Sequence, residues 1–345
     1  MNSNAINDLE FKRRHWPGWC PLESEPALFN DILKSLGVKD AQVEEIYDLS
    51  SIVEAQWPSN TYGLIFLFRW TDTSDITTAE RKECSDVWFA NQVVDNSCAT
   101  LAILNIIFNA PQVDVGRDLS FFREFSQHLS PAYKGLALNS LPCLRQCHNA
   151  YARPREMESL DVDLMDSCKR KKGSIDVEDD ESFHFIAYTC VDDHLWELDG
   201  LKQSPVDLGL CTAASWTRKA APEIDARIRQ YSQDDIYFNL LAVTDSQETQ
   251  IRSAKNTAES QLRSLDEDLR LELVPGMLEG RADLISKKAE CQKLLTSLTL
   301  QLQEEAERLR AQNAYAQRRK HDYCCFVRGL LEALHEQGVL EDLVL

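Results

Sequence analysis

The stretch NQVVDNSCATLAILNIIFN, residues 91–109, decides how this chain folds. Its second part, Ala99–Asn109, is apolar almost all the way round, so a helix formed there must lie inside a domain and not on its surface. The three residues before Cys98 are Asp, Asn and Ser, which are residue types that begin helices. We therefore expect a buried helix that starts at a cysteine.

Other apolar segments predict the sheet against which this helix packs. Tyr62–Trp70, with the sequence YGLIFLFRW, is a continuous apolar run that indicates a strand buried on both faces at the centre of a sheet. Phe183–Val191 and Leu195–Asp199 predict a β-hairpin, and Ile236–Val243 predicts a last strand. The fold class we expect is α/β, with a central antiparallel-rich sheet flanked by helices. Three of these helices are predicted at Ala27–Leu36, Ser120–Leu129 and Pro142–Asn149.

From Ser246 onward the sequence predicts only helices. A stripe of apolar residues there requires a partner helix, which either comes from the same chain through a turn at Pro275–Gly276 or belongs to another protein. We expect two domains, residues 1–245 with the sheet and residues 246–345 as an all-helical, coiled-coil-like C-terminal domain. The stripe recurs every seven positions in two rows, Leu284, Cys291, Leu298 and Leu295, Leu302, Leu309, Ala316.

Composition limits the kinds of protein this chain can be. Its 345 residues fit two domains, and its formal net charge of −19, of which −16 belongs to residues 1–245, makes nucleic acid a poor partner and a basic protein a good one. No apolar run approaches the roughly 18 residues of a membrane helix, and the first residues lack the apolar core of a signal peptide. Eleven cysteines at irregular positions are typical of reduced thiols. We expect a cytoplasmic and nuclear protein with no membrane partner.

Cys98 is the candidate nucleophile. A thiol at a helix N-terminus feels the positive end of the helix dipole, and the pKa of such thiols can fall to roughly 3.5–7.5. On helix position alone, a buried structural cysteine is the more frequent case. Gln92 lies six residues earlier. Its side-chain amide, together with the backbone N–H of Cys98, is suited to stabilise the oxyanion of an acyl-transfer reaction.

His184 and Asp199 are the candidate base and its partner. Side chains alternate along strands, so a two-residue loop at Asp192–Asp193 puts Asp199 opposite Ile186 and diagonal to His184. A carboxylate there can orient the imidazole and stabilise the imidazolium that forms beside a thiolate. A loop of odd length would place the two side chains on opposite faces.

One further group of residues imitates a metal site. Cys143, Cys147 and His148 have the ligand types of a zinc cluster, but a second ligand pair is missing nearby. They are predicted to be ordinary residues of a helix. We expect neither a metal nor an organic cofactor, because a thiol nucleophile with a base needs none.

The residues assembled above resemble the ubiquitin carboxyl-terminal hydrolases, papain-like cysteine proteases with the catalytic order Gln, Cys, His, Asp. The resemblance implies an α+β papain-like fold and cleavage after the C-terminal glycine of ubiquitin. By resemblance Cys98 is the nucleophile, His184 is the general base and later acid, and Asp199 orients it. Gln92 is the oxyanion donor. The resemblance covers most of residues 16–245, in the segments WPGWCPLESEPALFNDILKSLGVKDAQVEEIYDL, YGLIFLFRW, WFANQVVDNSCATLAILN, SFHFIAYTCVDDHLWELDGL and IYFNLLAV.

Two further segments gain an expected role from the same resemblance. Leu22, Glu23 and Ser24 occupy the family's N-terminal segment that helps hold the ubiquitin tail. Residues 152–182 mix charge blocks with glycine and offer no apolar face, which predicts a long loop. By resemblance this loop is the crossover loop that arches over the catalytic groove and limits what can leave it.

The last helical segment indicates a subfamily. QRRKHDYCCFVRGLLEALHEQGVLEDLVL is similar to the C-terminal domain of the long family members, which are proteasome-associated or Polycomb-associated. This implies that residues 246–345 dock an activator with a deubiquitinase-adaptor domain. The long insert of the Polycomb type is absent, which favours the proteasome-associated form and a proteasomal ubiquitin receptor as partner. Two alternatives stay open, a chromatin-associated deubiquitinase and a ubiquitin-binding scaffold with an idle active site.

Overall fold

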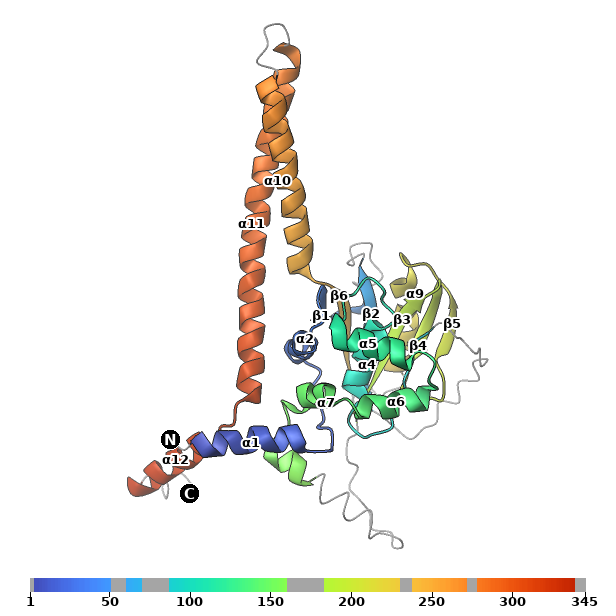
Figure 1. The fold of residues 1–345 in the computed structure, drawn as a ribbon, viewed down its shortest axis with the longest axis vertical. Helices are drawn as coiled ribbons and strands as arrows, with labels where there is room; N and C mark the ends of the chain where they lie inside the picture. Colours follow the sequence, from blue (N-terminus) through green and yellow to red (C-terminus); the bar gives the residue numbers. More distant parts are fainter. Residues whose placement is uncertain are drawn as a thin grey trace.

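A computed structural model of the chain describes residues 3–50, 60–69, 87–159, 183–229, 238–271 and 278–338. Figure 1 shows a body of sheet and helices from which a long pair of helices extends. Among the described residues, no helix has the length and apolar character that crossing a bilayer requires.

The sheet has six antiparallel strands in the order β1-β6-β2-β3-β4-β5. β2 lies in the middle of the sheet, between β6 and β3, and is buried along most of its length. This confirms the central strand predicted from YGLIFLFRW. The strand bounds are β1 Ala41–Glu45, β2 Thr61–Arg69, β3 Phe183–Val191, β4 His194–Leu198, β5 Val206–Leu210 and β6 Phe238–Asp245.

Helices cover both faces of the sheet. Helix α4, Cys98–Ile107, is buried at all ten positions and packs against β2 and β3 on one face, as its sequence predicts. The contact is close because β2 has no side chain at Gly63, where a Cβ would lie 2.6 Å from Ile106. Helix α9, Trp216–Ile228, packs on the opposite face against alternate residues of β2 such as Leu64. The N-terminus of α4 is thus fixed against the central strands.

The smaller helices surround α4. The predicted helices at Ala27–Leu36 and Pro142–Asn149 are confirmed. The helix expected at Ser120–Leu129 begins earlier, at Gly116, because the positive φ of +78° at Gly116 and its N–H bond to Asp114 (2.9 Å) start the helix there. The bounds are α1 Ser3–His15, α2 Pro26–Ser35, α5 Gly116–Ser126, α6 Pro131–Asn139 and α7 Pro142–Asn149.

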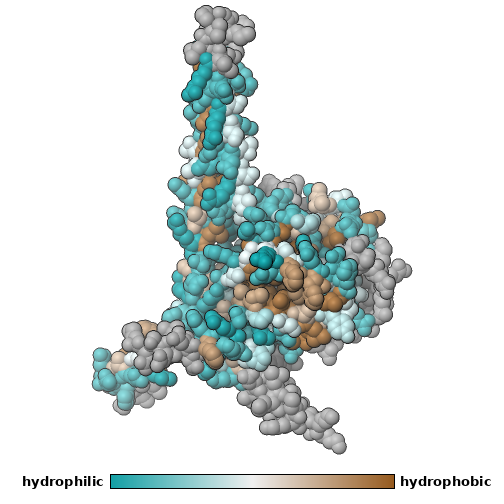
Figure 2. All heavy atoms as spheres, in the orientation of Figure 1, coloured by the Kyte–Doolittle hydropathy of each residue, from teal (hydrophilic) through white to brown (hydrophobic). Residues whose placement is uncertain are grey.

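The C-terminal part forms a helical hairpin. Helices α10, Gln247–Leu271, and α11, Leu278–Lys320, lie side by side and antiparallel, and Cys291 and Leu298 of α11 pack on Ala258 of α10. The seam is the narrow apolar row along an otherwise hydrophilic pair in Figure 2. Of the two partners open to the apolar stripe, the structure therefore supplies the one in the same chain. The predicted turn at Pro275–Gly276 lies outside the described residues.

The far half of α11 returns to the body of the protein. Ala316 packs with Leu28 and Ile32 of α2, and the Nδ2 group of Asn30 donates to Gln312 at 3.2 Å. A final helix, α12, spans Cys324–Glu336 and has no buried residue. The body and the helical hairpin are consequently joined by packing as well as by the chain.

Candidate active site

Cys98 is the first residue of α4. It is 9% exposed, while every later residue of the helix is buried in the core. Its sulfur therefore sits where the unpaired N–H groups of the helix present their positive end. This is the position that the sequence predicts for a nucleophile.

The β3–β4 hairpin carries His184 and Asp199. Asp192 and Asp193 both have positive φ, 49° and 58°, as the two central residues of a tight hairpin turn require. The pairing of Ala187 with Leu198 then extends to put Asp199 opposite Ile186, on the same side as His184. The loop length that the argument needed is confirmed. The Nε2 atom of His184 and Oδ1 of Asp199 are 2.7 Å apart, and both side chains are buried.

The electrostatics of this pair favour charges on both groups. Burial lowers the pKa of His184, but the hydrogen bonds and charges of Asp199 and Cys98 outweigh it and raise that pKa to about 9. Burial raises the pKa of Asp199, but the hydrogen bond from His184 and the N–H of Leu201 at 2.9 Å bring it below its usual value. An imidazolium hydrogen-bonded to a carboxylate is the consequence.

The Cys98 thiol lies near enough to His184 to help raise the pKa of its ring. The Nε2 atom of His184 is hydrogen-bonded to Asp199, so Nδ1 is the ring nitrogen that remains to interact with the Cys98 sulfur. The structure therefore brings the three predicted residues together, with the carboxylate hydrogen-bonded to the imidazole and the thiol beside the ring.

Gln92 lies next to Gly200, which follows Asp199 at the end of β4. Its backbone N–H donates to the carbonyl oxygen of Gly200 at 2.8 Å, directly after Asp199. A Cβ at position 200 would lie 2.6 Å from Leu101 and 3.1 Å from the Gln92 nitrogen, so only glycine permits this approach. The side-chain Oε1 of Gln92 is buried, and no partner for it exists among the described residues.

Two asparagines that sequence reasoning missed hold the loop before Cys98. The Nδ2 group of Asn91 donates to the carbonyl oxygens of Lys202 (2.5 Å) and Gly200 (3.3 Å). Asn96 has a positive φ of 60° and donates from Nδ2 to the carbonyl oxygen of Trp19 at 3.2 Å. The only local signal was the tolerance of asparagine for left-handed backbone. Their partners lie far away in the sequence, so no local pattern identifies them.

The residues expected to hold the ubiquitin tail make other contacts. Leu22 is partly buried against core residues, and the hydroxyl of Ser24 is buried with no hydrogen-bond partner among the described residues. Glu23 forms ion pairs with Arg153, at 3.3 Å, and with Arg319. These contacts do not bring the three residues to Cys98, and their role stays a prediction.

His148 has a structural place near the site. Its Nδ1 is 2.7 Å from the hydroxyl of Thr100, and its Nε2 is 2.7 Å from the carbonyl oxygen of Cys20. Since that carbonyl only accepts, the neutral ring donates from Nε2 and accepts at Nδ1, and complete burial lowers its pKa to about 4. His148 is a buried residue of α7, and within the described residues no group of three or more candidate metal ligands comes together.

Of the predicted crossover loop, the structure describes residues 152–159, of which 154–159 are helical. Residues 160–182 lie outside the described part of the chain.

Comparison with known proteins gives consistent matches. A family model described as ubiquitin carboxyl-terminal hydrolase, family 1, matches residues 19–229, and a second, described as ubiquitin carboxyl-terminal hydrolases, matches residues 295–340. Isozyme L5 of this hydrolase from Dictyostelium discoideum is 32% identical over 339 residues, which cover 95% of this chain and 94% of that protein. The hydrolase BAP1 of Xenopus tropicalis is 35% identical over 274 residues, covering 74% of this chain and 38% of that protein. The crystal structure of the Trichinella spiralis UCH37 catalytic domain bound to ubiquitin vinyl methyl ester matches with a TM-score of 0.55 and 31% identity, covering 66% of this chain and 96% of that one.

Proposed function

Because this chain belongs to family 1 of the ubiquitin carboxyl-terminal hydrolases, a family of thiol-dependent deubiquitinases, we propose that Cys98, His184 and Asp199 are its catalytic group. Gln92 completes the site as oxyanion donor, and residues 246–345 recruit the enzyme to the proteasome. The observation that supports the catalytic assignment is the buried hydrogen bond between Asp199 and His184, with the Cys98 sulfur nearby at the start of α4.

The reaction uses His184 twice, first as an imidazolium acid and then as a neutral base. The Cys98 thiolate attacks the carbonyl carbon of the C-terminal glycine of ubiquitin and forms a C–S bond, while the carbonyl oxygen becomes an oxyanion. When the C–N bond breaks, His184 gives its proton to the leaving amine and a thioester remains. Neutral His184 then takes a proton from water, whose oxygen attacks the thioester. The C–S bond breaks, ubiquitin leaves with a free carboxylate, and the thiolate and imidazolium are restored.

Gln92 and the backbone N–H of Cys98 would receive the oxyanion. The backbone N–H of Gln92 donates to the carbonyl oxygen of Gly200, the residue after Asp199. This hydrogen bond fixes the position of Gln92, the proposed oxyanion donor, relative to Asp199, the carboxylate that orients His184. The side-chain amide N–H of Gln92 would be the donor, while its buried Oε1 has no hydrogen-bond partner among the described residues.

Labelling with ubiquitin vinyl methyl ester tests the catalytic assignment. We expect the full chain to form one covalent adduct, Cys98→Ala to form none, and the control Cys143→Ala, which changes an exposed cysteine, to react like the wild type. Adduct formation by Cys98→Ala would contradict the assignment. A wild type that stays unlabelled with and without a proteasome extract would favour the idle scaffold.

Two features support recruitment through the C-terminal helices. The family model for residues 295–340 includes α12, which exposes Phe326, Val327, Leu330 and Leu331 to solvent. A single residue, Ser246, separates β6 from α10, so the chain has no long insert between sheet and helices. Apolar side chains presented on one helix are typical of helix-mediated docking.

Capture from a cell extract tests recruitment. We expect the immobilised full chain with Cys98→Ala to retain proteasome subunits, quantified by mass spectrometry. Adding Leu330→Asp on α12 should abolish this retention. The matched control Leu300→Asp changes an exposed leucine of α11 and should not. Retention of chromatin factors in place of proteasome subunits would favour the Polycomb-type alternative.

A further inference from the structure

A buried carboxylate that the reaction does not use lies close to the catalytic pair. Glu197 of β4 is 4% exposed and comes two residues before Asp199, so the two side chains lie on the same side of the strand. Side chains from three other parts of the chain bind it. The Nζ group of Lys202 is 2.7 Å from Oε1, Nη2 of Arg227 is 2.8 Å from Oε2, and the hydroxyl of Tyr188 donates to Oε2 at 3.2 Å.

Lys202 connects this carboxylate to the turn that carries Asp199. The backbone N–H of Lys202 donates to the carbonyl oxygen of Asp199 at 3.0 Å, and its own carbonyl oxygen accepts from Nδ2 of Asn91 at 2.5 Å. The positive charge of its ammonium group also helps to lower the pKa of Asp199. The ammonium group therefore lies within electrostatic range of two carboxylates, and it is bound to that of Glu197.

One oxygen of Asp199 is open to a second cation. In the described part of the chain, both hydrogen bonds of this carboxylate use Oδ1, one with Nε2 of His184 at 2.7 Å and one from the backbone N–H of Leu201 at 2.9 Å. A lysine bound at Oδ2 would place a positive charge beside the His184 ring and oppose the imidazolium. The position of the Lys202 ammonium group thus matters for the protonation of His184.

Arg227 of α9 fixes the orientation of Glu197. Its Nη2 group contacts both carboxylate oxygens, at 2.9 Å and 2.8 Å. Its guanidinium carbon also lies 5.8 Å from the centre of the Phe68 ring, whose neighbour at 5.8 Å is the ring of His184. A further carboxylate of α9, that of Glu223, acts on the Tyr188 hydroxyl. Glu197 therefore connects α9 with the turn after β4, and its Oε1 atom is held in contact with Lys202.

We propose that Glu197 is a positioning residue for the reaction. It binds the ammonium group of Lys202 and keeps it from pairing with Asp199, so that Asp199 orients His184. This role rests on the proposed catalytic function of Cys98, His184 and Asp199, and Glu197 acts on that group only through its neighbours. The alternative is a buried ion pair that does no more than join β4 to α9.

Removal of the anion, alone and together with the cation, tests this role. Glu197→Gln keeps the shape of the side chain but takes away the charge that holds Lys202. We expect kcat to fall with KM unchanged, because Glu197 is buried. The alkaline limit of kcat/KM should move to lower pH by about one unit or more from its wild-type position near pH 9. Adding Lys202→Met removes one cation as well as one anion, which restores the net charge, and the alkaline limit should return to near pH 9.

The assay is the pH dependence of hydrolysis of ubiquitin with a C-terminal fluorogenic amide. Glu305→Gln is the matched control, because Glu305 of α11 is 5% exposed and forms two hydrogen bonds of 2.7 Å with Arg308. Its profile should superimpose on that of the wild type. An unshifted alkaline limit in Glu197→Gln would overturn the proposal. A shifted limit that the added Lys202→Met does not restore would also overturn it, because loss of a lysine repairs only an effect that the lysine causes.

Two further outcomes are decisive. If circular dichroism shows that Glu197→Gln does not fold, the double variant carries the test: a folded protein with its limit near pH 9 supports the proposal, and an unfolded one reduces Glu197 to a structural role. A wild type that neither hydrolyses the amide nor forms an adduct with ubiquitin vinyl methyl ester contradicts the proposed function itself. An active wild type with an unshifted Glu197→Gln contradicts the positioning role alone.

Discussion

The substitution Asp199→Asn should move the alkaline limit of activity to lower pH. In the wild type the pKa of His184 is about 9, because Asp199 and Cys98 outweigh a burial effect that acts in the opposite direction. An asparagine keeps the shape of the side chain but removes the negative charge of Asp199, so the pKa of His184 should fall to its ordinary value of about 6.5 or below. In the proposed reaction the imidazolium of His184 protonates the leaving amine, so activity should be lost as pH rises through the pKa of His184. At pH 7.5 a pKa of 6.5 leaves roughly a tenth of the ring protonated, which predicts at least a tenfold loss of kcat/KM.

The assay is the pH dependence of kcat/KM with ubiquitin carrying a C-terminal fluorogenic amide. The sheet offers a matched control in His194 and Asp207, a second histidine–carboxylate pair with Nδ1 and Oδ1 2.9 Å apart. Asp207→Asn should leave the alkaline limb near pH 9. If the profile of Asp199→Asn superimposes on the wild type, Asp199 does not set the protonation of His184 and the catalytic assignment loses its electrostatic basis.

Three other outcomes follow from the same structure. Gly200→Ala places a methyl group 2.6 Å from Leu101 and 3.1 Å from the Gln92 nitrogen. It should lower kcat and reduce the free energy of unfolding, measured in urea, by about 1–3 kcal/mol. Gly329→Ala, whose new methyl group meets nothing within 4 Å, should change neither quantity. The pKa of His148 is about 4 in the folded chain and about 6.5 when the chain is unfolded, so the unfolded state binds more protons below pH 6.5. The contribution of His148 should therefore lower the free energy of unfolding by about 2 kcal/mol between pH 7 and pH 5. This decrease should be absent in His148→Gln. The acidic sheet-containing part of the chain should attract the basic tail of ubiquitin, so kcat/KM should decrease as sodium chloride is added. The rate of alkylation of Cys98 by a neutral reagent should stay constant. An unchanged kcat/KM would exclude electrostatic capture.

The features that the sequence predicts are those that local pattern controls. An all-apolar helix can lie only in the interior, and α4 does. The hairpin from Phe183 to Leu198 depends on the alternation of side chains and on a two-residue turn, so its register and the approach of Asp199 to His184 follow from counting. Both predictions need no knowledge of what lies beyond the element itself.

The features that it misses depend on which distant segments meet. Asn91 is held by residues 200–202, and the start of α5 depends on the backbone at Gly116. The apolar stripe of α11 shows that a partner helix is needed but not which chain provides it. Each of these needs long-range contacts, and a single sequence carries no record of them.

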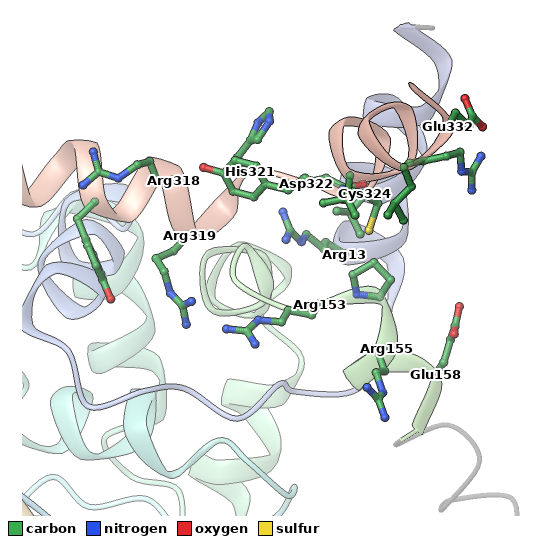
Figure 3. A pocket seen from close by; sticks show the side chains of 17 residues that line it. Arg13, Arg153, Arg155, Glu158, Arg318, Arg319, His321, Asp322, Cys324 and Glu332 are labelled. Carbon is green, nitrogen blue, oxygen red and sulfur yellow. The ribbon is translucent and has the colours of Figure 1, made fainter. Parts of the chain in front are cut away.

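Glu23 shows how such distant contacts bear on a role given by resemblance. Resemblance assigns this residue to the ubiquitin tail, whereas in the structure its carboxylate forms ion pairs with Arg153 and Arg319, whose side chains extend toward one another in Figure 3. A carboxylate can satisfy only a few donors at once, so a ubiquitin tail that uses Glu23 must compete with these two arginines.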